Sequence, residues 1–167
     1  AASDVYKRQY EMPYGGNDRL AQTTEDILEP DLPICDPHHH LWEFRSERVA
    51  NRYLMDEIQA DMASGHNIVS TVFVECGAMY RAYGSKEMRP VGETEFVNGI
   101  AAMSASGLYG TTRIAAGIVG QADLCLGKKV AAVLDAHLAA GGGRFRGIRR
   151  QANWDVSADI DNGRFVD

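Results

Sequence analysis

Two histidines separated by one residue, His38 and His40, are the side chains best suited to chemistry. They lie in the segment ICDPHHHLW, residues 34–42, which opens with apolar residues. Side chains alternate between the faces of a strand, so in a strand His38 and His40 share one face with Asp36. Neutral imidazole binds zinc and similar divalent metals. The spacing predicts a metal-binding pair, and predicts that His39, facing away, packs or hydrogen-bonds instead.

The alternative is an incidental run of histidines in a loop. Two histidines also leave a catalytic zinc site incomplete, because such sites usually have three protein ligands. His66 precedes a predicted strand and is expected at the opposite end of the sheet, whereas His137 lies on the apolar stripe of a predicted helix and is expected in the core. The remaining ligands are therefore expected beyond Asp167.

Glu75 ends a predicted strand at the same end of the sheet as the histidines. This carboxylate is a candidate for binding the substrate or a metal-bound water. The alternatives are that it pairs with an arginine or caps backbone amides.

The segment RFRGIRR, residues 144–150, offers guanidinium groups, which bind carboxylates through two parallel hydrogen bonds. Arg149 is nearer the end of its predicted strand and is the better candidate for binding an anionic substrate, with Arg146 behind it. Arg144 and Arg150 are expected to be surface or ion-paired residues.

The elements that position these residues alternate along the chain. Strands are predicted over 32–38, 68–76, 111–120 and 144–150, and helices over 53–65, 92–107 and 128–143. This order predicts an α/β fold with a parallel sheet covered by helices. A doubly wound nucleotide-binding sheet would have a glycine-rich turn after its first strand, where this chain has DPHHHLW. The pattern therefore favours a (β/α)₈ TIM barrel, whose active sites lie at the carboxyl ends of the strands.

The domain organisation follows from this pattern. Residues 1–32 are expected to form an irregular lead-in, in which residues 1–9 fit no element. Barrels of this kind typically need about 250 residues. Residues 33–167 are therefore expected to be the N-terminal half of a truncated barrel, with its first three to four βα units.

The segment DPHHHLW resembles the D-x-H-x-H-L-W opening of the amidohydrolase superfamily, in particular its amidohydrolase-related (family 2) branch of metal-dependent TIM-barrel hydrolases. STVFVEC (70–76), AAGIVGQADL (115–124) and GGRFRGIRR (142–150) resemble the second, third and fourth strands of that branch. The resemblance covers residues 34–150 and is nearest to the lactonase-like members.

This resemblance implies a hydrolase that opens a lactone or similar carboxylic-ester bond of a small carboxylate or sugar-derived compound. It assigns His38 and His40 as catalytic residues and ligands of a divalent metal, most simply zinc. A histidine from a later strand and a general-base aspartate after the eighth strand would complete the site. Some lactonases of this branch are thought to work without a metal, in which case histidines polarise the carbonyl.

Two alternatives to the lactonase stay open. The same branch contains metal-dependent decarboxylases of aromatic or unsaturated carboxylic acids. The chain could also be a catalytically incomplete fragment, whose open sheet edges and apolar faces favour association, including a homo-oligomer.

Composition excludes other classes of function. A net charge of −6 and a pI of about 5.3 argue against a nucleic-acid partner. The sequence contains no apolar run of about 18 residues, so no membrane span is predicted, and no signal peptide is recognisable. Three cysteines without a CxxC pair indicate reduced thiols that behave as small core residues in a cytoplasmic protein. The expected partner is a small, anionic substrate.

Overall fold

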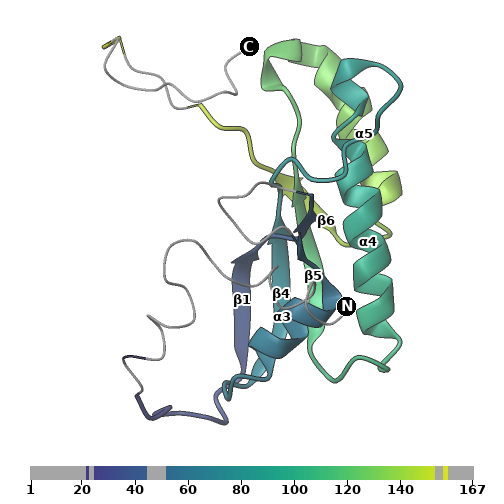
Figure 1. Ribbon diagram of the computed structural model, residues 1–167. Helices are drawn as coiled ribbons and strands as arrows, with labels where there is room; N and C mark the ends of the chain where they lie inside the picture. The colour runs from purple at the N-terminus through teal and green to yellow at the C-terminus, as the bar shows by residue number, and fades with distance from the viewer. Residues whose placement is uncertain (1–21, 23–24, 45–51, 153–155, 158–167) are drawn as a thin grey trace, which may run out of the picture.

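The computed structural model describes residues 22, 25–44, 52–152 and 156–157 (Figure 1). Most of the predicted lead-in over 1–32 lies outside the described residues, as does most of the chain after residue 152.

The described residues form a mixed α/β fold around a parallel sheet. Its four strands are β1 (Ile34–His39), β4 (Ile68–Val74), β5 (Arg113–Gly120) and β6 (Phe145–Ile148), and they lie in the sheet in this order. The helices α3 (Met55–Met62), α4 (Val91–Ala105) and α5 (Val130–Ala140) connect them in turn. All seven predicted elements are therefore confirmed, with shifted ends.

Short elements accompany this frame. The strands β2 (Trp42–Glu43) and β3 (Arg52–Tyr53) pair antiparallel, and the 3₁₀ helices η1 (Lys86–Met88) and η2 (Leu124–Lys129) precede α4 and α5. The sequence pattern did not predict these four short elements.

The main core lies between the sheet and its helices. Phe73 of β4 and Ile118 of β5 are fully buried and belong to one cluster with Ile58 of α3 and Val97 of α4. Right-handed crossovers between strands that are neighbours in both sequence and sheet place successive helices on one face. Figure 1 accordingly shows α4 and α5 together on one side of the sheet.

The apolar residues of the helices are buried only in part. In α5, His137 is buried as expected and Val133 is buried too, but Leu138 is 57% exposed. In α4 the buried stripe continues from Val97 through Ala101, while Met103 is 38% exposed. Each helix is covered on the side that faces the sheet, so fewer of its apolar residues are buried than the sequence contains.

Two of the cysteines contradict the expectation of core packing. Cys35 and Cys125 are exposed and Cys76 is half-buried; all three are free thiols. Cys35 lies at an exposed position of β1, and Cys125 lies in the short helix η2. No helix in the described part of the chain is long and apolar enough to cross a membrane.

Candidate functional site

The His pair, His38 and His40, lies at the carboxyl end of β1. Nδ1 of His40 is 2.8 Å from the carbonyl oxygen of Val74. A carbonyl only accepts hydrogen bonds, so Nδ1 carries the proton and donates it, and Nε2 of the neutral ring keeps its lone pair. That Nε2 lies 3.2 Å from Nε2 of His38. The two ring nitrogens that a metal would need thus converge on one point.

The backbone before this pair departs from a regular strand. Asp36 is opposite Thr71 and His39 is opposite Phe73, so β1 uses three steps where β4 uses two. This bulge breaks the alternation that was expected to group Asp36 with the His pair. Asp36 instead accepts a hydrogen bond from the backbone N–H of His38, with its Oδ1 at 3.0 Å. Pro37 lies within the bulge, where its missing N–H is tolerated.

His39 is directed into the protein, away from the His pair. It is 8% exposed, its Nε2 is 2.8 Å from Oγ1 of Thr71, and its ring meets Phe73 edge-on at 5.9 Å between centroids. Burial lowers the pKa of His39 to about 4, so the ring is neutral at neutral pH. The prediction that His39 packs and hydrogen-bonds is confirmed.

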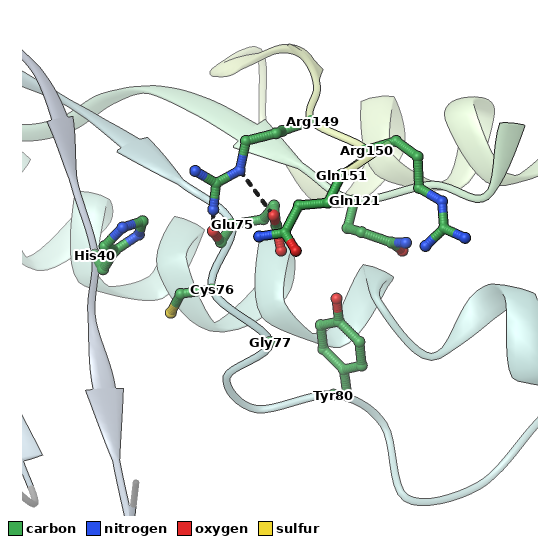
Figure 2. A pocket seen from close by; sticks show the side chains of 9 residues that line it. All are labelled: His40, Glu75, Cys76, Gly77, Tyr80, Gln121, Arg149, Arg150 and Gln151. Carbon is green, nitrogen blue, oxygen red and sulfur yellow. Dashed lines mark hydrogen bonds and ion pairs between the residues drawn. The ribbon is translucent and has the colours of Figure 1, made fainter. Parts of the chain in front are cut away.

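A cavity of about 480 Å³ lies beside His40 at the carboxyl ends of the strands (Figure 2). It is lined by His40, Glu75, Cys76, Gly77, Tyr80, Gln121, Arg149, Arg150 and Gln151. Figure 2 shows His40 on one side of the cavity and Arg150 on the other. Most of the lining side chains are polar, so the cavity suits a small, polar ligand.

Glu75 and Arg149 form an ion pair in this cavity. Nε of Arg149 donates to Oε1 of Glu75 at 2.8 Å, and Nη2 donates to the backbone oxygen of Glu75 at 2.6 Å. The structure therefore brings both predicted residues to one site. It also pairs them with each other, as the alternative reading of Glu75 allowed, so the charge of Arg149 is already partly compensated.

The other arginines of the segment have separate places. Arg146 is exposed, donates to the backbone oxygens of Gly143 and Phe145, and does not line the cavity. Arg150 lines the cavity although it was not expected there, with Nη2 at 3.8 Å from Asp123. Of the two arginines predicted to bind substrate, the structure brings only Arg149 to the cavity.

Glu93, in the first turn of α4, supports the cavity from behind and was not predicted. It is 1% exposed, and its Oε1 accepts the backbone N–H groups of Cys76 at 3.0 Å and Ala78 at 2.8 Å. Between them, Gly77 has a φ of +77°, which a residue without a side chain adopts freely. Burial raises the pKa of Glu93 to about 7. An acidic residue at a helix start is common, so the sequence offered no signal for this role.

The remaining candidate residues fall outside the site. His137 is fully buried, stacks on Phe145 at 5.0 Å, and bonds Thr94 and the backbone oxygen of Gln121. This confirms the expectation of a core histidine. His66 is exposed and lies just before β4, at the amino end of that strand.

The donor set can be compared with the needs of a metal. Two nitrogens bonded to one zinc at about 2.0–2.1 Å lie roughly 3.4 Å apart in tetrahedral geometry. The 3.2 Å between the Nε2 atoms of His38 and His40 is close to this value. Within residues 25–44 and 52–152, no group of three or more His, Cys, Asp or Glu is placed to hold a metal ion. The pair fits a metal as two of its ligands.

Comparisons with protein-family models, with curated proteins and with solved structures gave no match. The function is therefore inferred from the side chains themselves.

Proposed function

We propose that this chain forms consecutive βα units of a (β/α)₈ barrel hydrolase of the amidohydrolase-related kind, which opens a lactone or similar carboxylic-ester bond. The order β1-β4-β5-β6 supports the barrel, because neighbours in the sheet are also successive strands in the sequence. A doubly wound sheet would reverse its direction at a switch point. The cavity at the carboxyl ends of these strands is where such barrels bind substrates.

The observation that carries the proposal is the geometry of the His pair. The two Nε2 atoms lie 3.2 Å apart, and the Val74 carbonyl fixes the ring of His40 with its proton on Nδ1. A backbone carbonyl in this position is one of the means by which proteins orient a metal-binding histidine. Without a metal, the same tautomer lets Nε2 of His40 accept a hydrogen bond from Nε2–H of His38 at this distance.

His38 and His40 would hold a divalent cation, and their nitrogen donors favour zinc. When bound, this cation supplies a Lewis acid for the substrate carbonyl and lowers the pKa of bound water. The further ligands and the general-base aspartate of the proposed site come from later strands of the barrel. The described residues bind and orient the substrate beside the His pair.

The cavity favours a small lactone that carries hydroxyl groups or a single carboxylate. Tyr80, Gln121 and Gln151 offer uncharged hydrogen-bonding groups along one part of its wall. Arg149 is held by Glu75, so Arg150 is the cation more available to a substrate carboxylate, because its distance to Asp123 is 3.8 Å. Direct charge–charge binding by Arg149 would require it to exchange Glu75 for the substrate.

A panel of sugar-derived and aromatic-acid-derived lactones tests this function. The protein is the full-length enzyme that contains this chain, supplied with zinc. We expect ring opening of at least one lactone, abolished in His40→Ala and retained in the matched control His66→Ala. Release of carbon dioxide from aromatic or unsaturated acids, without lactone opening, would favour the decarboxylase instead. If the enzyme shows neither lactone opening nor decarboxylation, the proposal is refuted.

A further inference from the structure

The side chain of Thr71 links three strands of the sheet beneath the His pair. Thr71 is fully buried in β4. Its Oγ1 lies 2.8 Å from Nε2 of His39 in β1 and accepts the backbone N–H of Ala115 in β5, also at 2.8 Å. One hydroxyl group therefore connects both neighbouring strands.

This hydroxyl lies where the sheet is irregular on both sides. On the β5 side, Ser70 is opposite Arg113 and Val72 is opposite Gly117, so β5 has two extra residues there. The segment from 114 to 116 thus falls outside the regular ladder. Ala115 in this segment is fully buried and has a φ of +51°, which is costly for a residue with a side chain.

The Ala115 N–H has to find a partner within the protein, because a buried backbone donor left unpaired is strongly unfavourable. The Thr71 hydroxyl supplies this partner. On the β1 side, the bulge between Asp36 and His39 interrupts the regular pairing of β1 with β4. There the Thr71 hydroxyl contacts the ring of His39 and so connects the two strands at the bulge. The two contacts hold both irregular segments in place.

We propose that Thr71 is a positioning residue for the His pair, acting through His39; this inference rests on the function proposed for that pair. His39 lies between His38 and His40 in the chain, so a fixed His39 ring anchors the backbone from which both neighbouring side chains project. His40 must also reach the carbonyl of Val74, which is three residues beyond Thr71 on the same strand. The contacts Thr71–His39 and Val74–His40 together join the end of β1 to β4 at two points.

A purely structural hydroxyl would serve only Ala115 and the stability of the sheet. The Thr71→Val variant removes the hydroxyl and keeps the shape, while Thr71→Ser keeps the hydroxyl. Thr94→Val is the matched control, because Thr94 makes an equivalent buried contact with His137, 2.8 Å from its Nδ1, away from the His pair. All three substitutions can be compared at equal fraction folded.

The first readout is the tautomer of His40, followed by long-range ¹H–¹⁵N spectra of histidine-labelled protein. In the wild type, Thr71→Ser and Thr94→Val we expect a single form of His40 protonated at Nδ1. In Thr71→Val we expect a mixture of tautomers. The second readout is calorimetric titration with zinc alone, in which Thr71→Val should bind about tenfold or more weakly.

These readouts separate the two proposals. Zinc binding that is lost in His38→Ala but unchanged in Thr71→Val, with an unchanged His40 tautomer, overturns the positioning role and leaves the metal pair standing. A His40 tautomer that changes in Thr71→Val although the wild type binds no zinc supports positioning and refutes the metal pair. If Thr71→Val does not fold, His39→Phe removes the same link while the Ala115 contact stays, and the same changes are expected.

Discussion

The guanidinium of Arg149 binds Glu75 twice, through its side-chain carboxylate and through its backbone carbonyl. Glu75 follows β4 and Arg149 follows β6, so the pair spans the intervening strand β5 at the carboxyl end of the sheet. Glu75 is 8% exposed, whereas the side chain of Arg149 is 34% exposed. This pair therefore ties together the rim of the cavity.

Replacing Arg149 by Met should lower the free energy of unfolding by about 1–2 kcal/mol, because a largely buried Glu75 carboxylate loses its partner. The partial exposure of Arg149 keeps the loss at this modest level. Urea unfolding measures it, and the double variant with Glu75→Gln should be less destabilised than the sum of the single changes. Additive losses would show that the ion pair contributes nothing to stability.

The buried carboxyl of Glu93 makes stability depend on pH. Its pKa is raised from 4.5 to about 7, so between these values the folded protein binds more protons than the unfolded chain. The free energy of unfolding contributed by Glu93 therefore falls as the pH rises from 4.5 to 7, by up to about 3 kcal/mol. Glu93→Gln, which still offers an oxygen to Cys76 and Ala78, should lack this fall.

Urea unfolding of both proteins at several pH values isolates the Glu93 contribution as their difference. The comparison is needed because burial also lowers the pKa of His137. This shift makes the free energy of unfolding fall as the pH drops below 6.5, which is the opposite pH dependence to that of Glu93. The His137 contribution is common to both proteins and cancels. A difference that does not vary between pH 4.5 and 7 would contradict the raised pKa.

His137 should be needed for stability alone. His137→Leu leaves the buried hydroxyl of Thr94 and the carbonyl of Gln121 without their partner. We expect the free energy of unfolding to fall by about 2–3 kcal/mol, as thermal or urea unfolding would measure. Zinc affinity should stay that of the wild type under conditions where the variant is folded. A folded variant with weakened zinc binding would assign His137 to the site after all.

The alternating elements could be predicted from sequence because each carries a strong periodic signal. The β-branched run over 68–74 and the stripe containing Val133 and His137 are examples. The proximity of His38 and His40 at the carboxyl end of β1 could be predicted too, from their spacing of two residues and the order of the elements.

The irregular features could not be predicted in this way. The bulge in β1 and the left-handed Ala115 in β5 depend on register between strands, which no local pattern encodes. The pairing of Arg149 with Glu75 joins residues 74 apart, and so it depends on the finished sheet. Sequence reasoning could place each of these two side chains at one end of the sheet but could not decide whether they face a substrate or each other.

Zinc titration of the full-length enzyme that contains this chain, by calorimetry, tests the central claim most directly, because it examines the His pair without requiring turnover. The wild type should bind zinc, and both His38→Ala and His40→Ala should weaken binding by about tenfold or more, since each removes one ligand of the metal. The exposed His66 is the matched control, and His66→Ala should bind as the wild type does. Equal affinities in all four proteins, or no zinc binding by the wild type, would contradict the account.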